Sequence, residues 1–203
     1  MLIKLIDRFG TTFYVQVWEN RLKITDARTG SKFDEKPLMA VKTEANGKKN
    51  VVAVGNAAES YRGTPNTEVL NPFSHSRQLL CDFIAASALL QAALRQLFKG
   101  KLFSPRPAIC IHPMEKCEGG LTAVERRGFR ELCLSAGARD VKIYEGPELT
   151  ARGLVFDSIK EDESQALSST DIPSRGYGRL APTLAAAVWL VILGIYILFK
   201  NWL

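Results

Sequence analysis

The sequence predicts an α/β fold followed by one membrane-spanning helix near the carboxyl end of the chain. Three observations lead to this prediction. Apolar and polar residues alternate in short runs over the first half of the chain, as they do in β-strands. Residues 108–144 then read as a strand, a helix and a second strand, and residues 184–199 form a run without a charge.

Composition and charge narrow the class of protein. The 203 residues are 46% hydrophobic and 24% charged, values that exclude wholesale disorder and a polytopic membrane protein. Residues 1–156 carry 23 Lys and Arg against 16 Asp and Glu, a net charge of +7. Such a basic body suits nucleic acid, acidic lipid or an acidic protein. We expect no nucleic acid partner, because the chain has no motif in which basic and aromatic residues interleave.

Short strands are expected in the first half of the chain. They are residues 2–6, 13–17, 22–24, 38–41 and 51–54. The second and third flank the turn Glu19-Asn20-Arg21, and the last two are joined by Asn46-Gly47, a strong hairpin signal. Strands that follow one another so closely form an antiparallel meander.

The pattern changes to helical spacing in the second half. The expected elements are a helix over residues 76–99, a strand at 108–112, a helix over 123–136 and a strand at 141–144. Thr122 and Glu125 match the capping box that begins a helix, and Gly137 ends that helix. A strand, a helix and a strand with short connections form a βαβ unit, so we expect part of the sheet to be parallel.

The membrane helix is expected at residues 180–200. Leu180 to Phe199 is 20 residues, about the length that crosses the hydrocarbon core of a bilayer. The residues expected in the membrane and at its surface are Leu184, Trp189, Tyr196, Phe199, Lys200 and Trp202. The amino terminus lacks the apolar run of a signal peptide, so we expect a tail-anchored protein whose body stays cytoplasmic. Residues 157–178, with five acids and two bases, are expected to form a flexible acidic linker.

The four cysteines match no zinc pattern, and we expect no metal site. Cys110, His112 and Cys117 form a partial metal-binding pattern. The alternative is that Cys110 is a small apolar residue of a buried strand. If the body lies in the cytosol, the reducing conditions there would keep these thiols reduced.

Three segments resemble the rod shape-determining bacterial actins of the MreB family. Val51–Pro65 (VVAVGNAAESYRGTP) is similar to that family's AVG-x-x-A-x-x-x-x-GRTP, and Thr122–Glu145 contains its VERR and AGAR motifs. Arg106–Pro113 stands where the family has an RP-x-x-x-CVP strand, and Phe33–Val41 fits more loosely. The resemblance implies that residues 1–156 form the first lobe of an actin-like, ribonuclease H-like fold. It also implies a small α+β insert at about residues 25–69.

The resemblance implies an altered nucleotide site. The family's first phosphate loop reads DLGTANT, and aligning Gly10 and Thr11 with its GT places Arg8 where the family has a magnesium-binding aspartate. Asp7 lies one residue earlier, which in a strand is the opposite face. After residue 147, this sequence shows no segment that resembles the second lobe of the family. We therefore expect a degenerate loop, no cofactor and no ATPase activity.

The resemblance aligns Glu125 with the glutamate that positions the attacking water in the family. It is a weak catalytic candidate, because an acid in the first turn of a helix also stabilises that helix.

These features together predict a membrane-anchored, actin-like, non-catalytic interaction module at the bacterial inner membrane. It would contact an MreB-type cytoskeleton or other cell-envelope machinery. Two alternatives stay open. One is the cytoplasmic-domain component of a secretion or pilus assembly platform, and the other is an ATP-binding protein completed by a separate second lobe.

Overall fold

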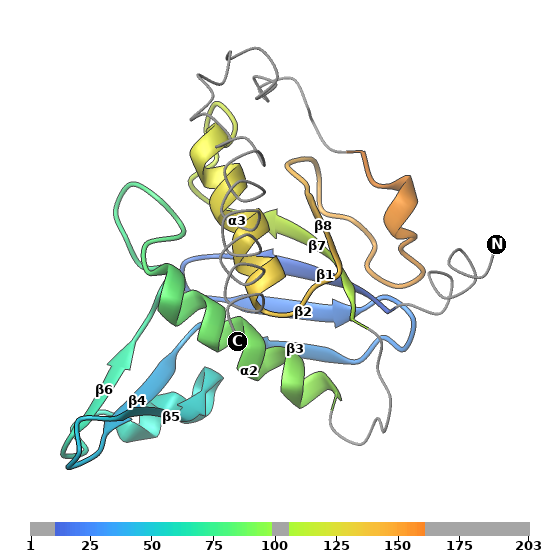
Figure 1. Ribbon diagram of the computed structural model, residues 1–203. Coiled ribbons are helices and arrows are strands. Elements are labelled where there is room, and N and C mark those ends of the chain that lie inside the picture. The colour runs from blue at the N-terminus through green and yellow to red at the C-terminus, as the bar shows by residue number, and fades with distance from the viewer. Residues whose placement is uncertain (1–10, 99–105, 161–203) are drawn as a thin grey trace, which may run out of the picture. The chain divides into compact units, whose positions relative to one another are not determined.

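The computed structural model describes residues 11–98 and 106–160 (Figure 1). The chain divides into two units, residues 1–166 and 167–203, and all described residues belong to the first. Their α/β architecture confirms the predicted class.

Several expectations fall outside the described residues. They concern the strand at 2–6, residues 161–178 of the linker and the membrane segment 180–200, with Leu184, Trp189, Tyr196, Phe199, Lys200 and Trp202. Within the described part of the chain, none of the helices has both the length and the apolar character needed to span a bilayer.

A five-stranded mixed sheet forms the centre of the fold. Its strands, in spatial order, are β3 (Lys32–Glu35), β2 (Leu22–Asp26), β1 (Thr12–Val17), β7 (Ala108–Pro113) and β8 (Asp140–Ile143). β1 is antiparallel to β2 and parallel to β7, and β7 is parallel to β8. The predicted first hairpin and the predicted βαβ unit are therefore confirmed, whereas β3 was not expected as a strand.

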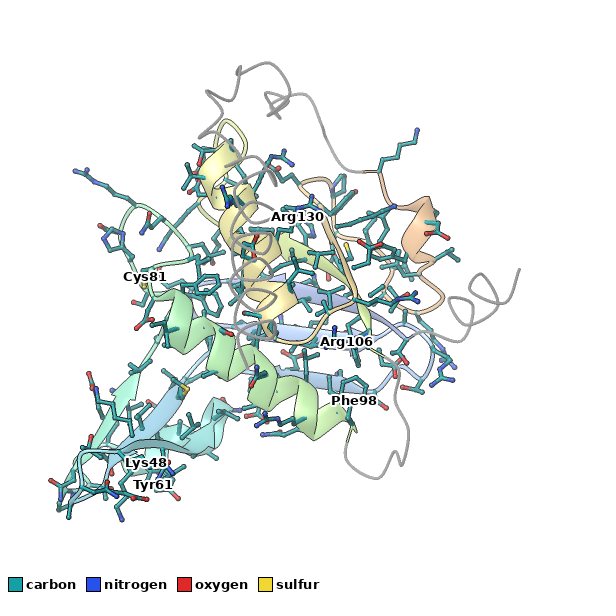
Figure 2. The ribbon with its side chains drawn as sticks, viewed as in Figure 1. Lys48, Tyr61, Cys81, Phe98, Arg106 and Arg130 are labelled. Carbon is teal, nitrogen blue, oxygen red and sulfur yellow. The ribbon has the colours of Figure 1, made fainter. Side chains whose placement is uncertain are left out.

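Two helices cover one face of this sheet, as Figure 1 shows. They are α2 (Phe83–Phe98) and α3 (Ala123–Ser135). Phe98, labelled at the end of α2 in Figure 2, packs edge-on against Phe13 of β1 with ring centroids 5.3 Å apart. Alternate strand residues such as Phe13, Val15 and Ile109 point into this core, because successive side chains of a strand point to opposite faces.

α2 begins later than the sequence pattern predicts. A helix over residues 76–99 was expected, but the helix starts at Phe83. The Asp82 carboxylate accepts a hydrogen bond from the N–H of Ala85 at 2.9 Å, which caps the first turn. Leu79 is nevertheless buried, so the apolar spacing before Asp82 reflects burial of a loop.

The insert is a separate three-stranded antiparallel sheet. Its order is β5 (Lys49–Val54), β4 (Met39–Thr43) and β6 (Thr67–Leu70), with the 3₁₀ helix η1 (Gly55–Tyr61) after β5. The predicted Asn46-Gly47 hairpin joins β4 to β5, and Gly47 has φ +80°. This second sheet begins at Met39 and not near residue 25, because β2 and β3 pair within the larger sheet.

A returning segment covers part of the other face of the larger sheet. Phe156 and Ile159 are buried against Tyr14 and Cys110, and Phe156 opens the short 3₁₀ helix η2 (Phe156–Ser158). The Lys142 ammonium donates to the backbone carbonyls of Phe156 and Ile159 at 3.0 and 2.8 Å. The packed body therefore extends at least to Ile159, beyond the predicted start of the linker at residue 157.

Candidate functional site

The carboxyl ends of β1, β7 and β8 form the candidate site. In open α/β sheets, ligands bind outside these ends, at the point where the direction of the connections changes. Here that point is β1, which has an antiparallel hairpin partner on one side and a parallel strand on the other. The segments that meet at this edge are the β1–β2 turn, the loop that follows β7 and the residues after β8.

The turn after β1 has Glu19 and Asn20 at its centre. The Trp18 N–H donates to the Arg21 carbonyl at 2.9 Å, and the Arg21 guanidinium lies over the Trp18 ring, 5.2 Å from its centroid. The Glu19 N–H donates to the Glu115 carboxylate at 2.7 Å. A backbone N–H that could bind an external anion is thus bonded to a side chain of the same protein.

Lys116 ties this turn to two other segments. Its ammonium lies 2.8 Å from Oε2 of Glu19 and also donates to the His75 carbonyl. The hydrogen bond from Lys116 holds the pKa of Glu19 below its usual value. Lys116 has φ +58°, a left-handed conformation that is uncommon for a residue with a long side chain.

A second ion pair lies after β8. The Glu145 carboxylate pairs with the Arg126 guanidinium of α3 and accepts the Leu121 N–H at 2.7 Å. The Glu145 and Arg126 side chains are only 12% and 15% exposed. The loop that follows β7 is therefore fixed at both ends. At its start the Glu115 carboxylate accepts the Glu19 N–H, and near its end the Leu121 N–H donates to the Glu145 carboxylate.

A buried polar chain lies below the edge. The Tyr14 hydroxyl is 2.6 Å from Nδ1 of His112 and accepts the Leu149 N–H at 3.2 Å. Burial lowers the pKa of His112 and raises the pKa of Tyr14 to about 12. Nearby, the Gln16 amide donates to the Glu148 carboxylate at 2.8 Å. The residues after β8 are thus fixed over the sheet by hydrogen bonds.

Only Thr11 of the predicted phosphate loop belongs to the described residues, and it does not lie at this edge. Thr11 is buried and lies at the amino end of β1, at the opposite edge of the sheet from the β1–β2 turn. Asp7, Arg8 and Gly10 lie outside the described residues. At the carboxyl edge, the turn after β1 has Glu19 and Asn20 at its centre and contains no glycine.

Glu125 forms the capping box of α3. Its carboxylate accepts the Thr122 N–H at 2.9 Å and the Thr122 hydroxyl at 2.7 Å, while the Glu125 N–H donates back to that hydroxyl at 3.3 Å. The structural role predicted for Glu125 is confirmed. The catalytic role stays an untested prediction.

The partial metal pattern is not assembled by the fold. Cys110 packs with Tyr14 and Phe156 on one face of the sheet, whereas Cys117 packs against the helical core on the other face. Burial raises the pKa of Cys117 to about 11, which disfavours the thiolate that metals bind. The described residues contain no group of three or more His, Cys, Asp or Glu suited to hold a metal ion.

Sequence reasoning missed the residues that occupy the edge. Glu115, Lys116 and His75 carry no motif, and Glu19 was assigned only as a turn residue. The available signal was positional, because Glu19 follows a strand and Glu115 follows the next parallel strand. Recognising it required the pairing of β1 with β7.

The resemblance to bacterial actins implies a nucleotide, and the carboxyl edge of the sheet is where a ligand of such a fold binds. A phosphate site needs free backbone N–H groups and positive charge. The described part of this edge has the Glu19 N–H bonded to Glu115 and places two carboxylates at the turn. It does not fit a nucleotide phosphate.

Comparison with known proteins agrees with the fold. The family model described as MreB/Mbl protein matches residues 23–165. The cell shape-determining protein MreB of Escherichia coli K12 is 33% identical over 158 residues, covering 75% of this chain and 43% of that protein. MreB of Haemophilus influenzae is 32% identical over 131 residues, covering 62% of this chain and 35% of that protein. The chain thus spans less than half the length of these relatives.

Solved structures show the same fold at low sequence identity. MreB5 of Spiroplasma citri bound to AMPPNP has a TM-score of 0.51 and 19% identity, covering 67% of this chain and 38% of that one. A non-polymerising MamK mutant bound to AMPPNP has a TM-score of 0.52 and 12% identity, covering 66% of this chain and 40% of that one. The match of the family model to most of the described residues carries the conclusion that this chain belongs to the MreB/Mbl family.

Proposed function

We propose that this chain is a membrane-anchored, non-catalytic module that assembles with actin-like chains of the MreB type at the bacterial inner membrane. Family membership supports a role of the cytoskeletal type. The uncharged run at residues 184–199 supports the anchor. The observation that carries the assembly role is the exposed face of α3.

The exposed face of α3 combines apolar and charged side chains. Val124 is 81% exposed and Leu134 is 40% exposed, large values for apolar residues of a helix. Arg127 and Glu131 are exposed between them. The opposite side of α3, with Phe129 and Leu132, is buried in the core. We call Val124, Arg127, Glu131 and Leu134 the α3 stripe.

The α3 stripe is self-complementary. Positions 124 and 134 are equally far from position 129, and so are positions 127 and 131. If two copies pair with their α3 helices antiparallel about a two-fold axis at Phe129, Val124 faces Leu134 of the partner subunit, and Arg127 faces Glu131 of the partner subunit. A two-fold interface requires this reciprocity, because the same patch serves both subunits. The α3 stripe therefore supports association with a second copy or with an MreB chain that has a similar helix.

One pair of helices buries little surface, so this contact is weak by itself. A membrane anchor raises the effective concentration of neighbouring bodies, which makes a weak contact sufficient. Anchoring and assembly thus support each other. Among the alternatives, an ATP-binding protein completed by a second lobe is disfavoured by the carboxylates of Glu19 and Glu115 at the candidate site.

A charge exchange tests the assembly role. The R127E variant places like charges at both reciprocal positions, so it should abolish association of the full chain in membranes. The R127E/E131R variant restores opposite charges and should recover it. Oxidative crosslinking provides the measurement: V124C/L134C should form dimers, whereas V124C alone should not, because the two copies of residue 124 then lie about 15 Å apart along the helices.

The crosslinking uses a C81S background, because Cys81, labelled just before α2 in Figure 2, is exposed. Dimers formed equally by V124C alone would contradict the antiparallel arrangement. Association that survives R127E would remove the α3 stripe from the proposal.

A further inference from the structure

At the carboxyl edge of the sheet, a carboxylate of the protein itself binds a backbone N–H that an external anion would need. The Glu19 N–H, at the carboxyl end of β1, donates to Oε2 of Glu115 at 2.7 Å. A carboxylate bound to a backbone N–H of a turn forms the same charge-assisted hydrogen bond as a phosphate oxygen would. Glu115 follows β7, so this contact joins the ends of the two central parallel strands.

The neighbouring residue holds this arrangement in place. Lys116 places its ammonium 2.8 Å from the Glu19 carboxylate and against the His75 carbonyl, and its side chain is only 19% exposed. It does so from a left-handed backbone conformation, φ +58°, which side chains of this length disfavour. The contacts of Lys116 compensate for that strain.

The segment after β6 adds a third set of contacts. The Asn71 amide donates to the Glu19 carbonyl at 2.7 Å, and the Ser74 hydroxyl donates to the Glu19 carboxylate at 3.3 Å. The turn is thus bound through its N–H, its carbonyl and its side chain. An incoming anion would have to displace Glu115 and would meet two carboxylates.

We infer that Glu115 is the internal ligand of the turn after β1 and that Lys116 locks it there, so that this edge is closed to phosphate-type anions. An internal ligand at this turn accounts for an edge that does not fit a nucleotide although the fold is actin-like. These contacts are independent of the proposed assembly role, because the α3 stripe takes no part in them.

Removing the Glu115 carboxylate should open the site. In E115A the Glu19 N–H loses its acceptor, one of the two carboxylates is absent and Lys116 remains. Pyrophosphate, an anion without a base or sugar, then has a free N–H and a cation at the same edge. In E115Q the side-chain oxygen still accepts the Glu19 N–H, so this variant is the matched control.

The experiment is calorimetric titration of the full chain in detergent with pyrophosphate, with the Glu19 amide resonance as the site-specific readout. We expect E115A to bind at least tenfold more tightly than the wild type and to shift the Glu19 resonance. E115Q should stay within about twofold of the wild type. E115S replaces E115A if the alanine variant does not fold.

Either of two results would overturn the inference. One is equal affinity of the wild type and the opened variant for pyrophosphate. The other is a gain of affinity without any change of the Glu19 resonance, which would place the anion elsewhere. Neither result bears on association through the α3 stripe, so failure of this inference is distinguishable from failure of the proposed function.

Discussion

At the residue scale, His112 determines how the residues after β8 are held. Its Nδ1 lies 2.6 Å from the Tyr14 hydroxyl, and it also hydrogen-bonds the backbone of Gly146. The Tyr144 ring packs edge-on against it, with centroids 5.0 Å apart. A neutral imidazole satisfies these contacts, whereas an imidazolium cannot accept the Tyr14 proton.

The pKa of His112 predicts the pH dependence of stability. Because burial lowers this pKa in the folded state, the unfolded chain binds more protons than the native chain below about pH 6.5. Stability should therefore fall as the pH decreases from 7.5 to 5.5, which thermal unfolding can measure. H112N should flatten the change, since the asparagine oxygen accepts the same bond without titrating.

The control is H75N, because His75 is the other histidine of the chain and is exposed. This variant should keep the wild-type pH dependence. The carboxylates with lowered pKa, such as Glu19 and Glu148, lose their contribution only as the pH falls below about 4.5, outside this window. An unchanged slope in H112N would contradict the assignment.

At the element scale, α3 has a buried side and an exposed side with different side chains. Its first turn is closed by the capping box of Thr122 and Glu125, and its buried side carries Phe129 and Leu132. Its exposed side carries the α3 stripe. Arg130, labelled on α3 in Figure 2, donates to the Val141 carbonyl at 3.1 Å, which fixes the helix over β8.

The capping box predicts which residue of the pair matters for stability. T122A removes the acceptor of the Glu125 N–H and should lower the free energy of unfolding by about 1 kcal/mol. E125Q keeps an acceptor for the Thr122 N–H and should lower it by less than about 0.5 kcal/mol. Chemical denaturation provides both values. A larger loss in E125Q than in T122A would indicate a role for the Glu125 charge beyond capping.

At the scale of the whole molecule, the described body has its larger sheet covered by helices on one face and partly covered on the other. The helices cover one face, and residues through Ile159 pack on the other. The body is also basic, with a net charge of +7 over residues 1–156. A proposed membrane anchor would hold this positive body beside acidic lipid, where salt weakens only the electrostatic part.

Deletion of residues 180–203 tests the anchor. The full chain should stay in the membrane fraction in high salt and in carbonate, because burial of about 20 apolar residues is not screened by ions. The deletion variant should appear in the soluble fraction. A second test places a protease site at residue 165 and cleaves after membrane isolation: in high salt the body should be released, and residues 166–203 should stay in the membrane fraction. Release of the intact chain by salt alone would exclude a spanning anchor.

The sequence by itself determined the elements whose signals are local. Thr122 and Glu125 predicted the start of α3 because a capping box is made by residues three positions apart. Asn46-Gly47 predicted the β4–β5 hairpin, since that turn needs a residue with positive φ. Apolar alternation and helical spacing predicted the α/β class and the strands of the first hairpin, and the family motifs added the actin-like fold.

Only the tertiary structure decided the candidate site. Glu19 and Glu115 are 96 positions apart, and they meet because β1 pairs in parallel with β7. The pairing follows from burial of both strands in one sheet, a non-local effect that periodicity does not report. Burial of Leu79 in the loop before α2 is likewise a tertiary effect, whereas the start of the helix at Phe83 follows from a local hydrogen bond, that of the Ala85 N–H to the Asp82 carboxylate.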